Sequence, residues 1–225
     1  MSTTELIYLI EPADPAQDSI RNTIGGRPIL PAGMDWPVCH CGLGMIFFFQ
    51  LDIPDDVADF GGDHLLVFQC PKHNDACFPP PTPRLPARYW DQPPPPNQLP
   101  FWRIILGRGG EAHPDADPHL RPRPLALCRS AEMPDQRGKG MRAFKLSGVP
   151  SWAQDPERYQ CACGTDLKFL CQVPEDFEFE TLAGQEEQPG WYSADNYALF
   201  LGNEIYLLAC PAHCHPAAVW PVNQN

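Results

Sequence analysis

The chain has 225 residues, of which 43% are hydrophobic and 11% aromatic, and its formal net charge at pH 7 is −12. This content is enough for packed cores, and the negative charge argues against nucleic acid as a partner, because binding to phosphates depends on a basic surface. The first residues lack the basic start and apolar stretch of a signal peptide, and no run approaches the roughly 18 apolar residues that a membrane helix needs. We therefore expect a soluble, cytoplasmic protein that makes no contact with a membrane.

The sequence patterns predict short strands throughout most of the chain. Runs rich in aromatic and aliphatic residues, bounded by proline or glycine, favour strands at 45–53, 65–69, 101–106, 125–128, 141–146, 167–173, 197–201 and 204–209. Helical turns are expected only at 54–60 and 193–197. Ten prolines between residues 78 and 100 predict extended loops, because proline cannot donate to a strand ladder. The predicted fold class is mainly β (α+β).

One pattern occurs twice along the chain. Cys-x-Cys-Gly-x-x-Met/Leu-x-Phe-x-x-Gln begins at Cys39 and again at Cys161, and each copy is followed by Cys-Pro-x-His. The first blocks align without a gap when the sequence is shifted by 122 residues, and the second blocks align at a shift of 140. This repetition predicts an internal duplication of one antiparallel β unit. The expected organisation is a first repeat at 1–78, a proline- and arginine-rich connecting region with some strands at 79–145, and a second repeat at 146–225.

Each repeat carries a complete set of metal ligands. In a reducing compartment, cysteines at such spacings are read as ligands rather than as disulfides. Thiolates with imidazole favour Zn²⁺, and a site closed by four protein ligands is structural. The sequence therefore predicts two structural Zn²⁺ sites, and their expected ligands are Cys39, Cys41, Cys70 and His73 in the first repeat and Cys161, Cys163, Cys210 and His213 in the second.

The fourth ligand of each site has an alternative. Cys77 could replace His73, and Cys214 could replace His213, which would give two sites made only of cysteine. The histidines are preferred because they alone occupy matching positions in the two repeats. The remaining cysteines, Cys128 and Cys171, are expected to be buried thiols.

The residues around the first motif resemble those of known families. The glycine-proline lead from Ile24 to Pro28, the Trp36-Pro37 pair and the Cys-x-Cys-Gly motif with its strand ending in Gln50 resemble the bacterial YwqG-like family of unknown function. They are also similar to the programmed cell death 2 family. Both resemblances imply a duplicated, β-rich fold. The cysteine pairs here are Cys-x-Cys, whereas Cys-x-x-Cys is more usual in the family, so the ligand assignment depends on the spacing in this chain.

Charge and resemblance together suggest a binding protein. Residues 84–145 hold eleven of the sixteen Lys and Arg residues and only six acids, so the rest of the chain is strongly acidic. We expect a non-enzymatic, zinc-binding interaction module with a basic protein partner, and resemblance to YwqG-like proteins makes an immunity protein against a basic toxin the first hypothesis. The alternatives are a chaperone that escorts a basic ribosomal protein, as the second resemblance implies, and a zinc-containing hydrolase-like enzyme.

Overall fold

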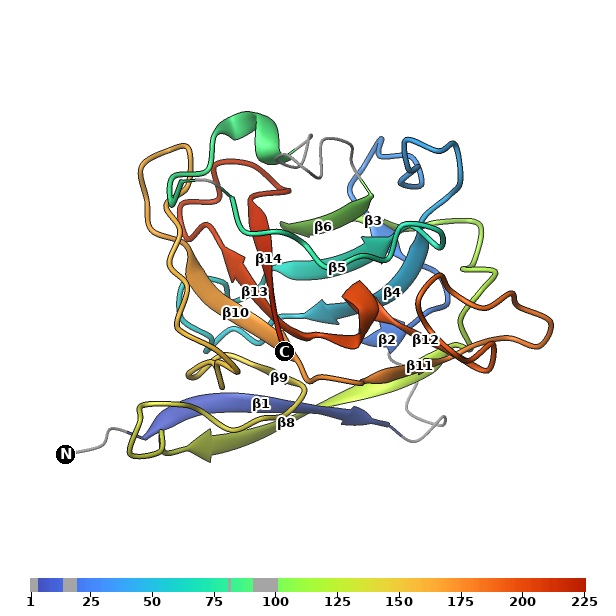
Figure 1. Ribbon diagram of the computed structural model, residues 1–225. Helices are drawn as coiled ribbons and strands as arrows, with labels where there is room; N and C mark the ends of the chain where they lie inside the picture. Colours follow the sequence, from blue (N-terminus) through green and yellow to red (C-terminus); the bar gives the residue numbers. More distant parts are fainter. Residues whose placement is uncertain (1–3, 14–19, 81, 91–100) are drawn as a thin grey trace.

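The computed structural model describes residues 4–13, 20–80, 82–90 and 101–225 and is dominated by one antiparallel sheet of ten strands (Figure 1). The strands in sheet order are β14 (Val219–Gln224), β13 (Glu204–Ala209), β10 (Lys168–Val173), β9 (Lys145–Leu146), β1 (Glu5–Pro12), β8 (Arg123–Glu132), β2 (Thr23–Ile24), β4 (Ile46–Asp52), β5 (His64–Gln69) and β6 (Trp102–Gly107). Two small sheets pair β3 (Ile29–Leu30) with β7 (Glu111–Ala112), and β11 (Glu178–Glu180) with β12 (Asn196–Ala198).

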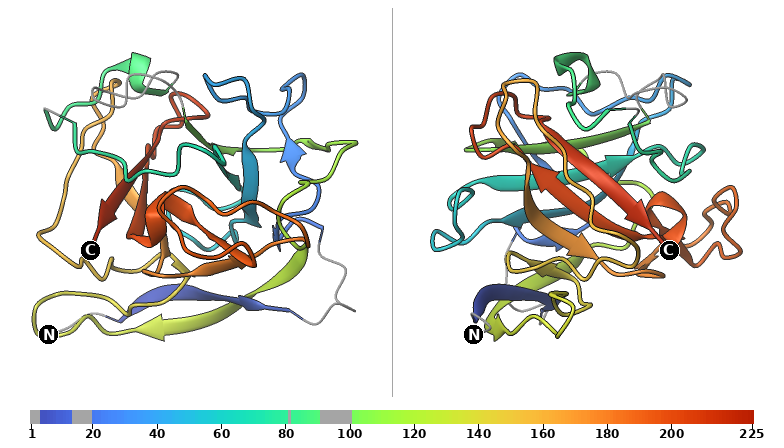
Figure 2. Two further views of the ribbon diagram at one scale, coloured as in Figure 1. Left: turned by 45° about the vertical axis from the view of Figure 1, so that its right-hand side comes forward. Right: turned by 60° about the vertical axis from the view of Figure 1, so that its left-hand side comes forward.

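The long pair formed by β1 and β8 lies at the middle of the sheet. Its register runs from Glu5 opposite Glu132 to Pro12 opposite Leu125. On either side of this pair the strands follow a matching order, with β2, β4, β5 and β6 beyond β8, and β9, β10, β13 and β14 beyond β1. The sheet curls until its two ends approach each other, as the two views of Figure 2 show. There the backbone N–H of Leu106 in β6 donates to the carbonyl of Pro216, just before β14, at 2.8 Å. The sheet is thus nearly closed.

The core lies inside this curled sheet. All residues of β5 and β13 are buried, as are six of the seven residues of β4, because the sheet wraps its inner face and loops cover much of the outer one. The β11–β12 hairpin covers β4, and the ring of Phe179 meets Phe48 edge-on at 4.9 Å between centroids. Burial of such aromatic side chains supplies most of the driving force for folding.

Most of the predicted strands are confirmed. The strand expected at 204–209 has those bounds, those expected at 65–69 and 167–173 differ by one residue at one end, and those expected at 45–53 and 101–106 differ by one residue at each end. The strand expected at 125–128 extends over the ten residues of β8, whereas only two residues of the run at 141–146 pair as β9. Strands β1 and β14 and the short strands β2, β3, β7 and β11 were not predicted, and residues 81 and 91–100 of the proline-rich stretch lie outside the described residues.

The strand predicted at 197–201 is wrong beyond Ala198. The chain turns there into a short 3₁₀ helix, η2 (Leu199–Gly202), in which Phe200 and Leu201 have positive φ angles of 48° and 57°. The backbone N–H of Phe200 donates to the side-chain carbonyl of buried Gln69 at 2.9 Å, so a tertiary contact overrides the local β preference.

The segment 54–60 forms single hydrogen-bonded turns with helical spacing, as predicted, because the N–H of Val57 donates to the carbonyl of Pro54 and the N–H of Gly61 donates to the carbonyl of Val57, both at 3.0 Å. The helical turn predicted at 193–197 is wrong, because that segment forms a bend and part of β12. A second 3₁₀ helix, η1 (Ala87–Trp90), was not predicted. In the described ranges no helix is long and apolar enough to cross a membrane.

Several hydrogen bonds recur in the two halves at positions 122 residues apart. The side-chain carbonyl of Gln50 accepts from the backbone N–H of Ile29 at 2.8 Å, and that of Gln172 accepts from Ser151 at 3.0 Å. The ladder between β4 and β5 shifts its register between Phe47 and Phe49, and the ladder between β10 and β13 shifts at the equivalent place, between Phe169 and Cys171. The two halves therefore share local geometry as well as sequence.

Candidate metal centres

The first Cys-x-Cys-Gly motif forms a tight turn just before β4. The backbone N–H of Gly42 donates to the carbonyl of Cys39 at 2.8 Å, and the N–H of Cys39 donates to the carbonyl of Leu43 at 2.8 Å. Gly42 has a φ of 84°, which a residue with a side chain rarely adopts. The turn therefore brings the sulfurs of Cys39 and Cys41 to the same side of the chain.

The neighbouring strand supplies the other two members of this first cluster. Strand β5 leads directly into Cys70, whose thiol accepts a hydrogen bond from the backbone N–H of Lys72 at 3.4 Å. His73 follows on the same loop, and its Nδ1 lies 3.4 Å from Cys70 Sγ and 3.5 Å from Cys39 Sγ. Cys41 Sγ lies 3.7 Å from Cys70 Sγ. One ligand atom from each of the four residues lies within 4.8 Å of all the others, so the cluster could hold one metal ion.

The second motif repeats the same turn before β10. The backbone N–H of Gly164 donates to the carbonyl of Cys161 at 2.9 Å, the N–H of Cys161 donates to the carbonyl of Thr165 at 2.8 Å, and Gly164 has a φ of 93°. Strand β13 leads into Cys210 as β5 leads into Cys70. Cys163 Sγ lies 3.6 Å from Cys210 Sγ. The second cluster is therefore assembled by the same pair of elements as the first.

The fourth member of the second cluster is Cys214 and not His213, which corrects the preference drawn from the sequence. Cys214 Sγ lies 3.2 Å from Cys161 Sγ, and Cys161, Cys163, Cys210 and Cys214 form the group within 4.8 Å. His213 adopts a positive φ of 48°, and its Nε2 lies 2.5 Å from the carboxylate of buried Asp63. An alignment of histidines could not reveal this, because Asp63 is 150 residues away in sequence.

The environment of the thiols differs within each cluster. Burial raises the pKa of Cys39 to about 12 and that of Cys161 to about 11. The hydroxyl and backbone N–H of Thr165 instead lower the pKa of exposed Cys163 to about 6. A buried thiol stays protonated unless a cation stabilises its thiolate. The arrangement is therefore suited to a divalent cation, which would compensate several sulfur charges at once.

The remaining cysteines lie outside both clusters, and all ten cysteines are free thiols. Cys77, the alternative to His73, is buried, and its backbone N–H contacts the side chain of Asn223. Cys171 is buried as predicted, but the prediction for Cys128 is wrong, because this thiol is exposed on β8 beside Glu11. His40 lies close to the first cluster, with its Nδ1 3.4 Å from Cys39 Sγ.

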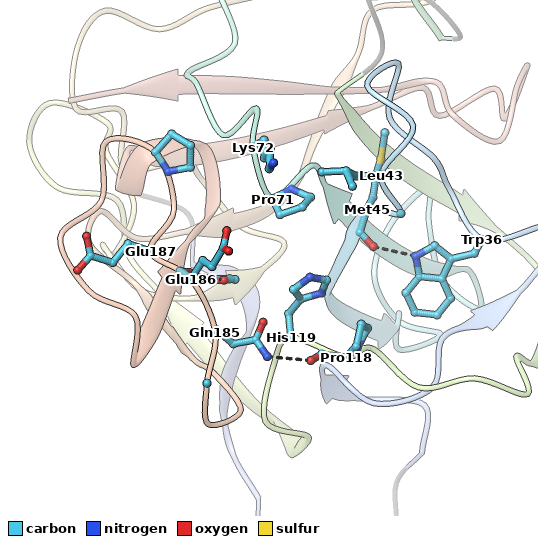
Figure 3. A pocket seen from close by; sticks show the side chains of 14 residues that line it. Trp36, Leu43, Met45, Pro71, Lys72, Pro118, His119, Gln185, Glu186 and Glu187 are labelled. Carbon is cyan, nitrogen blue, oxygen red and sulfur yellow. Dashed lines mark hydrogen bonds between the residues drawn. The ribbon is translucent and has the colours of Figure 1, made fainter.

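A cavity beside the first cluster was not predicted from the sequence. It has a volume of ≈ 670 Å³, and Trp36, Lys72, His119 and Glu186 are among the residues that line it (Figure 3). One wall is the loop between β11 and β12. This loop belongs to the extra residues of the second repeat, which increase the alignment shift from 122 to 140 residues. That change of shift is the only signal in the sequence that could have drawn attention to it.

No protein-family model matches the chain, and no curated protein matches it. The resemblance to the YwqG-like and programmed cell death 2 families stays a prediction.

Proposed function

We propose that each cluster binds one structural Zn²⁺ ion. A tetrahedral zinc with Zn–S bonds of about 2.3 Å and Zn–N bonds of about 2.0 Å places two sulfurs about 3.8 Å apart and a sulfur about 3.5 Å from a nitrogen. The sulfur pairs Cys41–Cys70 and Cys163–Cys210 are 3.7 and 3.6 Å apart, and Cys39 Sγ lies 3.5 Å from the Nδ1 of His73, whereas the Cys161–Cys214 pair is closer, at 3.2 Å. These edge lengths are the observation that carries the proposal.

A structural role follows from the number of ligands. Four protein ligands fill a tetrahedral site, whereas a catalytic zinc keeps one position for water or substrate. One ion would join the turn before β4 to the end of the neighbouring strand β5. The other would join the turn before β10 to the end of the neighbouring strand β13. Zinc binding of this kind contributes on the order of 10 kcal/mol to folding.

We also propose that the chain is an internal duplication in which each copy binds its own zinc. The matching strand order on the two sides of the β1–β8 pair supports this. In that order β2 pairs with β8 and β9 pairs with β1, so each repeat is completed by a long strand that lies across the centre of the sheet. The second repeat would then depend for stability on β1 of the first repeat, and the first repeat on β8 of the connecting region.

The proposed biochemical role is a non-enzymatic module that binds a basic protein. Closed zinc sites hold the fold and leave recognition to the surface. Many basic residues of the 84–145 segment are already in ion pairs with acids of the flanking segments, as in Arg108–Asp63, Arg123–Glu180, Arg129–Asp56 and Arg142–Glu204. The net charge of −12 therefore reflects carboxylates that remain available to a partner.

Two partners fit this role. The first is a basic toxin, which the protein would neutralise as an immunity protein, and the second is a basic ribosomal protein that it would escort as a chaperone. Each identity depends on a family resemblance. A zinc-containing hydrolase-like enzyme remains the third candidate, and the closed ligand sets count against it.

Partner capture tests the proposed role. The zinc-loaded full chain is immobilised, bound proteins are identified by mass spectrometry, and the association rate of the purified partner is measured at low and high salt. A toxin domain encoded by an adjacent gene supports the immunity role, and a ribosomal protein supports the chaperone role. Because opposite charges steer association, the rate should fall by about tenfold or more between 50 and 500 mM salt. Equal rates at both salt concentrations would contradict a charge-guided binding module.

A further inference from the structure

The cavity beside the first metal cluster has the dimensions of a binding site. Its volume of ≈ 670 Å³ lies inside the range of about 300–1,000 Å³ that is usual for ligand pockets. It lies between two parts of the chain that are far apart in sequence, the loops of the first cluster and the loop that joins β11 to β12. In Figure 3, Trp36 lies on one side of the cavity, Glu186 and Glu187 lie on the other, and His119 lies between them.

The first cluster fixes one wall. Leu43 and Gly44 follow the Cys41-Gly42 pair, and Pro71 and Lys72 lie between the two candidate ligands Cys70 and His73. A metal ion that joins these two loops would also set the distance between them. The shape of this wall therefore depends on the first cluster.

The opposite wall is fixed by hydrogen bonds. The side-chain amide of Gln185 donates to the carbonyl of Pro118 at 3.0 Å, and the hydroxyl of Tyr197 donates to the carbonyl of Glu186 at 2.6 Å. The backbone N–H of Leu182 donates to the carbonyl of His119 at 2.7 Å. The loop is thus held against the first half of the molecule before any ligand binds, which lowers the entropic cost of binding.

The two walls offer different kinds of contact. Trp36 is held by a hydrogen bond from its Nε1 to the carbonyl of Met45 at 2.7 Å, and with Leu43 and Pro71 it provides an apolar surface. On the other side, Glu186 and Glu187 are exposed, and neither forms an ion pair with another described residue. A ligand that uses both sides must therefore be extended, with an apolar group at one end and a polar or charged group at the other.

The charge of the lining selects the sign of that group. The lining contains two glutamates, Glu186 and Glu187, and one lysine, Lys72, so it carries a net negative charge. Three thiolates, one neutral imidazole and one Zn²⁺ in the first cluster would add about −1. The field in the cavity therefore favours a cation.

We propose that this cavity binds a short, extended basic segment of the protein partner, with an arginine or lysine at Glu186 and Glu187 and an apolar side chain against Trp36. The inference rests on the proposed function, since it assigns a site to the basic partner. It also gives a role to the segment that distinguishes the second repeat from the first.

The test uses the zinc-loaded full chain and a fluorescein-labelled pentapeptide in which three arginines alternate with two leucines. Fluorescence anisotropy at 50 mM salt gives the Kd. The double variant Glu186→Gln and Glu187→Gln should raise the Kd about tenfold, whereas Lys72→Ala should lower it about twofold, because it removes a repelling charge. The matched control, Glu111→Gln with Glu178→Gln, removes the same charge at exposed positions that do not line the cavity and should leave the Kd within about twofold.

Three results would overturn the proposal. The first is that the unmodified chain shows no saturable binding of the peptide. The second is an equal loss of affinity in the control variant, which would indicate binding by net charge alone. The third is tighter binding after loss of the two carboxylates, which would indicate an anionic ligand. Binding of the purified partner distinguishes a failure of this proposal from a failure of the proposed function. If the variant that lacks both carboxylates binds the partner as tightly as the unmodified chain does, the cavity is not the site, but the protein is still a binding module.

Discussion

The imidazole of His213 contacts the buried carboxylate of Asp63, with 2.5 Å between Nε2 and Oδ2. Asp63 precedes β5 in the first half of the chain, and His213 lies on the loop that carries two candidate ligands of the second half. Nε of Arg108 lies 3.4 Å from the other carboxylate oxygen of Asp63, so both oxygens have a partner. The contact therefore ties the second metal loop to the first half and leaves the fourth ligand position to Cys214.

A pair of single variants should separate these roles. Cys214→Ser should reduce the zinc content from two ions to one per chain, because it removes a member of the second cluster. His213→Ala should retain both ions, although it should lower the free energy of unfolding by about 1–3 kcal/mol, since it leaves a buried carboxylate with one partner fewer. Metal analysis of the purified variants checks this. Loss of one zinc in His213→Ala with both retained in Cys214→Ser would restore the ligand set first expected from the sequence.

The first cluster allows the same comparison between two histidines. His73 Nδ1 contacts two of the cluster's sulfurs, whereas His40 contacts only Cys39. His73→Ala should therefore lose one zinc or bind it at least about tenfold more weakly, and His40→Ala should keep both ions. Competition with a chromophoric chelator measures the affinity. If the two variants lose zinc equally, both imidazoles contribute to the site.

Gln50 is predicted to be the most sensitive glutamine of the first half. Its buried side chain accepts a hydrogen bond from the backbone N–H of Ile29, donates to the carbonyl of Ile20 at 2.7 Å, and has its Oε1 3.1 Å from Nε2 of His64. Gln50→Ala should lower the free energy of unfolding by about 2–4 kcal/mol, because it leaves a cavity and several unpaired polar groups. Urea unfolding of the zinc-loaded chain measures the change, and exposed Gln136→Ala should shift it by less than about 0.5 kcal/mol. Equal effects of the two substitutions would contradict the structural role of Gln50.

The stability that Asp52 provides should depend on pH. Partial burial opposes its ionisation, but hydrogen bonds from His64 and Arg21 outweigh this effect and lower the pKa of Asp52 from 3.8 to about 2. Because the pKa is lower in the folded state, the contribution is present above about pH 4 and is lost as the pH falls towards 2. The difference in unfolding free energy between the unmodified chain and Asp52→Asn should therefore be largest near neutral pH and should shrink below pH 4. A difference that stays constant from pH 6 to pH 3 would contradict this assignment.

Much of the fold could be predicted because its strands have strong local signals. The runs that became β4, β5, β10 and β13 are dense in aromatic and aliphatic residues and are bounded by turn residues. The pairing of β1 with β8 has no such signal, because it joins segments more than 100 residues apart. The turn at Phe200 likewise depends on the side chain of Gln69, which only the tertiary structure brings near.

The candidate metal centres could be predicted for a related reason. A Cys-x-Cys-Gly turn is a local structure, and the strand pairing that follows it brings Cys70 and Cys210 to the same place in each half. Seven of the eight ligands expected from the sequence lie in the two clusters. The eighth, His213, could not be judged locally, because the contact with Asp63 decides its position. The cavity next to the first cluster was missed because it is formed by two distant loops.

Metal content is the most direct test of the central claim that two zinc ions hold the two halves of the sheet. The full chain is purified without added chelator, its zinc is measured by elemental analysis against an accurate protein concentration, and native mass spectrometry gives the number of ions per chain. We expect two zinc ions per chain, and we expect the protein to unfold when a strong chelator removes them. Fewer than two ions in a folded sample, or a sheet that remains folded after complete removal of metal, would contradict the account.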